Sequence, residues 1–284
     1  SEIYQGLSDT GTAIVPFGDD YFDTLLNNAQ QFTQNILTFG ERDVSLADAG
    51  VDMQQAKEIG LTDEDTVLLM GDVFADDVEV GNTSTFSLNF NFDIDEIESQ
   101  NVTLNFAGEH NISNALAAAA CAQALGLSID DIAKGLDAAK PAKGRLNFIE
   151  FGRHTLIDDT YNANPSAVIA ATQVLVSQGA PTLLVLGDIG ELGDAAQEEH
   201  RKLGEAIAAS GVTVLYTVGE LTPVTVAQAQ ASGMQAQAYP DKATLLAAIK
   251  DKLTSSDDAW HILFKGSRYM RMEQIIDELT RQPF

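Results

Sequence analysis

Basic residues are scarce in this chain: 16 Lys and Arg stand against 42 Asp and Glu, which gives a formal net charge of −26. A chain this acidic is repelled by a phosphate backbone and by an anionic membrane surface. These charges therefore argue against nucleic acids and membranes as partners. Any anionic ligand must be held by local positive charge and by backbone N–H groups.

Cysteine is almost absent as well, since Cys121 is the only one. An intrachain disulfide is impossible, which is consistent with a cytoplasmic protein. Cys121 lies in an alanine-rich run, where we expect it to be a small buried core residue. Apolar runs long enough to span a bilayer are also missing. What the chain does have is 284 residues of which 45% are hydrophobic, enough for packed cores in two domains.

The first part of the chain, to about residue 144, predicts a mixed α/β structure. The expected strands lie within 12–17, 35–40, 66–93 and 101–106, and an early helix is expected over 19–32. An alanine-rich helix follows, and after it a second helix that Ser128 opens and that runs to about Ala139. The short basic segment KPAKGRLNF, with Pro141 and Gly144, reads as a hinge between domains.

The second part alternates strands and helices. The expected strands are 155–158, 182–187, 213–219, 234–239 and 261–266, and the expected helices are 166–178, 194–210, 221–232, 241–254 and 269–281. This order predicts βαβ units in a Rossmann-like domain with a mainly parallel sheet. Ligands of such sheets bind beyond the carboxyl ends of the strands. That rule selects three loops, IDDTYNANP, LGDIGELG and FKGSR.

Three uncharged polar residues open the alanine-rich helix: His110, Asn111 and Asn114. Their spacing of three and four residues makes them neighbours on the helix surface. An asparagine side chain offers the donor and acceptor that an adenine edge requires, and a neutral imidazole can stack on a base. The alternative is that Asn111 or a neighbour simply caps the helix, and spacing alone favours the cap.

Other candidates also have structural alternatives. The segment KGR with Arg145 suits a phosphate or ribose contact, but it also suits a solvated hinge. Asp159 could grip a ribose hydroxyl, whereas Asn162, Asn164 and Pro165 are also ordinary turn and helix-start residues. The loop LGDIGELG has the spacing GxxGxxG, which fails the dinucleotide fingerprint, and its two acids would repel a pyrophosphate.

The segment FKGSR gives a sharper signal. Lys265, Ser267 and Arg268 leave a strand and enter a helix, which predicts an anion site. No zinc spacing occurs, and His154, His200 and His261 read as structural or surface residues.

Taken in order, GEHNISNALAAAA, KGRLNFI, IDDTYNANPSA, VLGDIGELG and FKGSR resemble the ATP-dependent Mur ligases of peptidoglycan synthesis. The resemblance implies an α/β fold in which residues 1–144 are the later part of the central ATP-binding domain and residues 145–284 the Rossmann-like C-terminal domain. The pairing of GDIGELG with KGSR is typical of members that join D-alanyl-D-alanine to UDP-N-acetylmuramoyl-tripeptide. In such an enzyme ATP and Mg²⁺ convert the tripeptide carboxylate into an acyl phosphate, which the dipeptide amine attacks.

The resemblance also assigns roles to residues. It implies that ATP is bound by His110, Asn111, Asn114, Arg145 and Asp159. It implies that substrate is bound by Tyr161, Asn162, Asn164, Lys265, Ser267 and Arg268. The enzyme is expected to be a monomer.

The chain departs from the family in lacking the GxxGKT phosphate loop. The family's modified lysine and magnesium ligands have no counterpart in it either, so no catalytic or metal-binding residue is assigned. We therefore expect these 284 residues to bind no cofactor tightly and to be inactive alone. Three alternatives stay open: another Mur-type ligase, a folylpolyglutamate synthase, and a non-catalytic nucleotide-binding module. A diamino-acid ligase would be expected to carry a DNPR-type motif, which is absent.

Overall fold

The computed structural model describes residues 2–45, 57, 62, 66–93, 96–255 and 257–281. The chain divides into two compact units, Ser1–Ala139 and Lys140–Phe284. The segment 140–148 begins at this division, and the assignment of the two domains stays a prediction. Within the described ranges, no helix is both long enough and apolar enough to cross a membrane.

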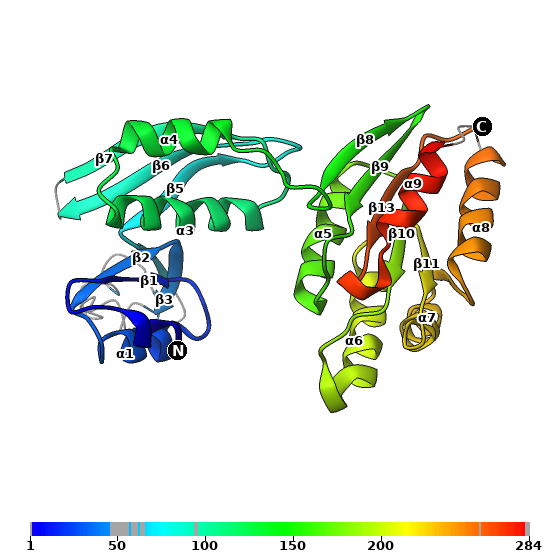
Figure 1. Ribbon diagram of the computed structural model, residues 1–284, viewed down its shortest axis with the longest axis horizontal. Coiled ribbons are helices and arrows are strands. Elements are labelled where there is room, and N and C mark those ends of the chain that lie inside the picture. Colours follow the sequence, from blue (N-terminus) through cyan, green and yellow to red (C-terminus); the bar gives the residue numbers. More distant parts are fainter. Residues whose placement is uncertain are drawn as a thin grey trace. The chain divides into compact units, whose positions relative to one another are not determined.

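Unit 1 is built on a five-stranded mixed sheet, shown with its labels in Figure 1. Its order is β1 (Thr12–Pro16), β2 (Asn35–Phe39), β5 (Val73–Glu79), β6 (Ser84–Asp93) and β7 (Glu96–Leu104). The pairs β1–β2 and β2–β5 are parallel, whereas β5–β6 and β6–β7 are antiparallel. A separate two-stranded antiparallel sheet pairs β3 (Glu41–Ser45) with β4 (Thr66–Met70). A 3₁₀ turn, η1 (Glu2–Gly6), and the helix α1 (Phe22–Ala29) complete the first part of the unit.

Two further helices of unit 1, α3 (His110–Ala124) and α4 (Ile129–Ala138), lie along the sheet (Figure 1). The buried residues of α3 recur at helical spacing and pack against strand residues such as Leu88 and Phe90; they are Ile112, Ala115, Leu116, Ala119 and Ala120. Cys121 falls outside this stripe and is exposed, so the prediction that it is buried is wrong. Ser128 caps α4 as predicted, because its Oγ accepts from the N–H of Asp131 at 3.2 Å.

Unit 2 is built on a six-stranded sheet. Its order is β12 (Gln235–Tyr239), β11 (Val214–Val218), β10 (Thr182–Gly187), β13 (His261–Lys265), β9 (His154–Asp159) and β8 (Asn147–Phe151). Every neighbouring pair is parallel except β8–β9, so the prediction of a mainly parallel sheet is confirmed. Strand β8 was not predicted, because its first residues lie within the Pro- and Gly-containing segment 140–148 that was read as a hinge.

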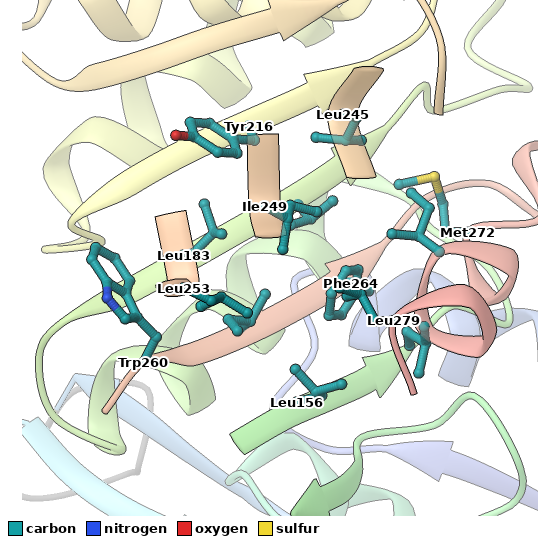
Figure 2. Close-up of a cluster of buried hydrophobic side chains, with 14 of the residues drawn as sticks. Leu156, Leu183, Tyr216, Leu245, Ile249, Leu253, Trp260, Phe264, Met272 and Leu279 are labelled. Carbon is teal, nitrogen blue, oxygen red and sulfur yellow. The ribbon is translucent and has the colours of Figure 1, made fainter. Parts of the chain in front are cut away.

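The helices of unit 2 cover the two faces of this sheet. They are α5 (Pro165–Ser177), α6 (Ala196–Ala209) preceded by the 3₁₀ turn η2 (Gly193–Ala195), α7 (Thr222–Ala231), α8 (Lys242–Thr254) and α9 (Glu273–Arg281). Side chains of α8 and α9, such as Leu245 and Leu279, pack with Leu183 and Phe264 of the strands (Figure 2). Helix α6 contacts both α5 and α7.

The last helix begins later than the sequence predicts. A 3₁₀ turn, η3 (Arg268–Met270), comes first, and Arg271 adopts the left-handed conformation with φ 48°. An α-helix cannot pass through a residue in that conformation. The helix therefore starts at Glu273 rather than at Tyr269.

Candidate functional site

The first turn of α3 shows what its polar residues do. The helix follows Glu109, and no side chain caps it. Asn111 lies inside the first turn, where its Nδ2 donates to the carbonyl of Ala107 at 2.8 Å. The prediction that Asn111 or a neighbour caps the helix is therefore wrong, because the amide group donates backwards instead of accepting a backbone N–H.

The same residues form a small polar surface. Asn114 Nδ2 donates to Asn111 Oδ1 at 3.2 Å, and Asn111 Nδ2 lies 3.3 Å from His110 Nε2. His110 and Asn114 are exposed and Asn111 is half-buried. These contacts fix the orientation of the three polar side chains.

A cavity of about 420 Å³ lies at the carboxyl ends of β1 and β2, next to the same helix. On the helix side it is lined by Ile112, Ser113 and Leu116, and by Glu109, which precedes α3. The strand side supplies Pro16, Gly18, Asp19, Phe39, Gly40, Glu41, Ala75 and Val78. The polar residues His110, Asn111 and Asn114 are not among the lining residues, so the cavity and the polar surface are separate features of α3.

In unit 2, Asp159 and Lys265 form a buried ion pair. Lys265 Nζ donates to Asp159 Oδ2 at 2.5 Å and to the carbonyl of Asn162 at 3.0 Å. The two charged residues are only 8% and 3% exposed. They end the adjacent parallel strands β9 and β13, where Lys265 pairs with Asp159 in register. Two residues predicted to bind different ligands thus form one buried ion pair.

Arg145 is carried by a loop that this pair helps to shape. Asp159 Oδ1 accepts from the N–H of Leu146 at 3.3 Å, and the carbonyl of Gly144 accepts from the N–H of Tyr161 at 3.0 Å. Gly144 has φ +75°, and a Cβ there would lie 3.0 Å from Tyr161 N, so the tight approach requires glycine. The exposed Arg145 guanidinium stacks on the Tyr161 ring, with its Cζ 4.4 Å from the ring centroid.

The two asparagines of this loop differ in what they do. Asn164 is the N-cap of α5: its Oδ1 accepts from the N–H of Ala167 at 2.8 Å, ahead of Pro165 in the first turn. Asn162 is exposed, and its Oδ1 accepts from the N–H of Arg268 at 3.3 Å. Asn164 is therefore a helix-start residue, which was the structural alternative for this loop. Asn162 lies at the surface beside Arg268.

Lys265, Ser267 and Arg268 are not equivalent. Ser267 is buried, and its Oγ accepts from the N–H of Gly190 at 2.8 Å. Arg268 is exposed, and its Nη1 donates to Glu273 Oε1 at 3.0 Å. Because Lys265 is held by Asp159, only Arg268 of the two cations stands at the surface. Of the three residues predicted to bind an anion, only Arg268 therefore presents its charged group at the surface.

Sequence reasoning missed Tyr269. Its ring is 62% exposed and lies against Gly190, where a Cβ would meet Tyr269 Cε1 at 3.0 Å. Partial desolvation raises the pKa of Tyr269, and the carboxylates of Asp188 and Glu220 raise it further. An aromatic residue directly after a basic loop was the available signal.

Among the histidines predicted to be structural or surface residues, His200 is structural. His200 is fully buried: its Nδ1 lies 2.8 Å from the carbonyl of Ala196, and its Nε2 accepts from the N–H of Ile189 at 3.3 Å. Within the part of the chain that the structure describes, no three His, Cys, Asp or Glu side chains gather where they could hold a metal ion. We assign no Mg²⁺ ligand to these residues.

Comparison with known proteins decides the family. The model of the Mur ligase middle domain matches residues 1–122, and that of the Mur ligase glutamate ligase domain matches residues 144–268. The chain belongs to the Mur ligase family. These matches agree with the α/β fold predicted for a Mur ligase.

Named Mur ligases resemble the chain at the level of sequence and structure. The UDP-N-acetylmuramoyl-tripeptide–D-alanyl-D-alanine ligase of Escherichia coli is 38% identical over 182 residues, which are 64% of this chain and 39% of that protein. A crystal structure of MurF from Acinetobacter baumannii, 36% identical, matches 99% of this chain and 54% of its own with a TM-score of 0.80. MurF from Thermotoga maritima in complex with ADP is 21% identical, with a TM-score of 0.69, and shows the shared fold. The chain thus spans about half the length of these relatives or less.

Proposed function

We propose that this chain forms part of an ATP-dependent ligase that adds D-alanyl-D-alanine to UDP-N-acetylmuramoyl-tripeptide in peptidoglycan synthesis. The observation that carries the proposal is the 36% identity to A. baumannii MurF along 99% of the chain. The E. coli relative, 38% identical, bears the name of that activity. In the proposed reaction, phosphoryl transfer from ATP activates the tripeptide carboxylate, and the dipeptide amine then displaces phosphate to form the amide.

ATP binding is the first role that we propose for these residues. His110, Asn111 and Asn114 read the adenine edge, because their mutually hydrogen-bonded side chains present oriented polar groups at the surface. The ADP complex of the T. maritima relative supports the use of an adenine nucleotide. Arg145 contacts ribose or phosphate through its exposed guanidinium. Asp159 supports the Arg145 contact by fixing the Arg145 loop through Leu146 N–H.

Substrate binding is the second role. Tyr161, Asn162 and Arg268 are exposed, so they can touch the incoming dipeptide, and the Arg268 guanidinium suits its carboxylate. The loops that carry these residues are held in place by Lys265, Ser267 and Asn164. Lys265 holds the carbonyl of Asn162, Ser267 fixes Gly190, and Asn164 caps α5. The enzyme is proposed to act as a monomer.

A chimeric ligase tests the proposal. The part of the E. coli relative that precedes its match is joined to this chain, and product formation is followed with ATP, Mg²⁺ and UDP-N-acetylmuramoyl-tripeptide. We expect amide formation with D-alanyl-D-alanine and little with single amino acids. Use of glutamate instead would favour a folylpolyglutamate synthase, and use of another single amino acid would favour a different Mur-type ligase.

The 284 residues alone provide the second arm of the test. They contain no GxxGKT, and γ-phosphate and metal contacts supply most of the stabilisation in phosphoryl transfer. We therefore expect no product from the chain alone, and pentapeptide formed by it would contradict this expectation. Saturable ATP binding by the chain, together with a folded but inactive chimera, would favour the non-catalytic nucleotide-binding module.

A further inference from the structure

The loops after β10 and β11 meet at the carboxyl edge of the unit 2 sheet. The two strands are parallel neighbours, and Gly187 pairs with Val218 at their ends. Asp188 and Gly219 therefore follow side by side. In α/β sheets this edge, and above all the amino end of the helix after a strand, is where phosphate groups bind.

The amino end of α7 is already occupied by a side chain. Asp188 Oδ2 accepts from the N–H of Glu220 at 2.7 Å, and its Oδ1 accepts from those of Leu221 and Thr222 at 3.0 and 2.9 Å. Asp188 is only 5% exposed. The helix has no cap from its own adjoining side chain, so the carboxylate supplies the acceptor that its first amides need.

The backbone around Asp188 is arranged for this contact. Gly219 has φ +150°, and a Cβ there would lie 2.2 Å from Asp188 Oδ1. Any other residue at 219 would displace the carboxylate. From the opposite side, the carbonyl of Asp188 accepts from the N–H of Ser267 at 3.0 Å. The two loops contain no lysine or arginine, whereas Glu191 and Glu220 add further negative charge.

We propose that Asp188 is a specificity-determining residue: its carboxylate fills the anion site at the amino end of α7 and excludes the phosphate groups of a nucleotide from this edge of unit 2. The three N–H groups that would cradle a phosphate bind the chain's own anion. A phosphate would also have to approach Glu220 and Glu191 without a compensating cation. Anionic groups of ligands instead bind the exposed guanidinium groups of Arg145 and Arg268. This inference goes beyond the proposed ligase activity and does not depend on it.

Anion rescue tests the inference in the 284-residue chain itself. The variant Asp188→Ala frees the three amides, and Asp194→Ala is the matched control, because it removes one exposed acid from the same loop without touching them. Thermal unfolding is followed in inorganic phosphate and in chloride at equal ionic strength. We expect phosphate to raise the midpoint of Asp188→Ala by roughly 3 °C more than that of the wild type or of Asp194→Ala.

Amide NMR signals of Glu220, Leu221 and Thr222 give a direct readout. Phosphate or AMP should shift them saturably in Asp188→Ala and leave them in place in the wild type. Equal phosphate responses in all three proteins, or shifts of these signals in the wild type, would overturn the inference. If Asp188→Ala does not fold, Asp188→Asn is titrated in its place. Its neutral amide keeps one acceptor, so a smaller phosphate shift at the same amides is expected, and none would refute the inference.

Discussion

Lys265 and Asp159 form a buried ion pair between the ends of two neighbouring strands, with Nζ 2.5 Å from Oδ2. The pair lies beneath the surface residues of the candidate site. Asp159 reaches the Arg145 loop through Leu146 N–H, and Lys265 reaches the carbonyl of Asn162. One contact therefore shapes two of the segments predicted to bind ligands.

Breaking this pair should destabilise unit 2 strongly. Lys265→Met leaves the Asp159 carboxylate buried without its cation, and removing one partner of a buried pair costs about 3–5 kcal/mol. Urea unfolding measures the change. The Lys202–Glu199 pair is the control: Lys202 is exposed and Glu199 half-buried, so Lys202→Met should cause a much smaller loss. The double variant Lys265→Met with Asp159→Leu should recover much of the lost stability. A loss no greater than that of the control would show that the buried pair is unimportant.

The Tyr161 ring should restrict the motion of the Arg145 guanidinium. A cation–π contact at an exposed site is worth about 0.5–1 kcal/mol, so the stack forms part of the time even in water. Tyr161→Ala should increase the picosecond-to-nanosecond mobility of Arg145 Nε–H in ¹⁵N relaxation. Tyr161→Phe keeps a ring and should leave that mobility near the wild-type value. Equal mobility in all three proteins would mean that the stack does not position Arg145.

Two buried threonines should respond in opposite directions to substitution by valine. Thr172 and Thr225 are both helical and fully buried. Thr172 Oγ1 donates a hydrogen bond to the carbonyl of Val168 at 2.7 Å. Thr225 Oγ1 has no hydrogen-bond partner within the described residues. Thr225→Val removes an unsatisfied hydroxyl and should stabilise the fold by about 1 kcal/mol, whereas Thr172→Val should destabilise it by a similar amount. Chemical denaturation of both variants checks the contrast.

Stability should fall as the pH drops through the range in which histidine titrates. Burial lowers the pKa of His154, the Arg153 charge lowers it further, and the ring accepts from the N–H of Trp260 through Nδ1. On acidification, His154 therefore binds its proton at a lower pH in the folded state than in the unfolded state. The stability is full above the unfolded pKa of about 6.5 and is lost as the pH falls from there towards the lower folded pKa. Burial lowers the pKa of His261 in the same direction.

The variant His154→Asn tests this pH dependence, because its amide oxygen can still accept from Trp260. Unfolding free energies are measured between about pH 5 and 7.5. The variant should lose less stability than the wild type on acidification, with His261 accounting for part of the remainder. An unchanged slope would show that His154 does not contribute.

Much of the fold follows from sequence periodicity. The strands and helices of unit 2 lie close to their predicted positions because buried strands read as short apolar runs between amphipathic helices. Strand β8 was missed since it is an edge strand beside a hinge-like segment, and its place depends on pairing with β9. The late start of α9 at Glu273 depends on the conformation of Arg271, which no local pattern indicates.

The candidate site was harder to predict, because residue type does not show which groups neutralise one another. Lys265 looked available to a ligand, but Asp159 binds it from a strand more than a hundred residues away in sequence. The sequence predicts that Asp188 repels a pyrophosphate, but the three backbone N–H groups that its carboxylate binds come together only when β10 and β11 pair. The reading of Asn111 as a cap failed because the helix begins at His110, two residues earlier than a cap at 111 requires.

The loops at the carboxyl edge of unit 2 are fastened to one another through buried polar groups, whereas only a few side chains project from them. Directed evolution toward a new acceptor would therefore do best by randomising Tyr161, Asn162, Arg268 and Tyr269. Changes at Asp159 or Ser267 would mostly yield misfolded clones. The scaffold and the selectivity for the acceptor are thus encoded at separate positions, so that the acceptor selectivity can be changed without rebuilding the scaffold.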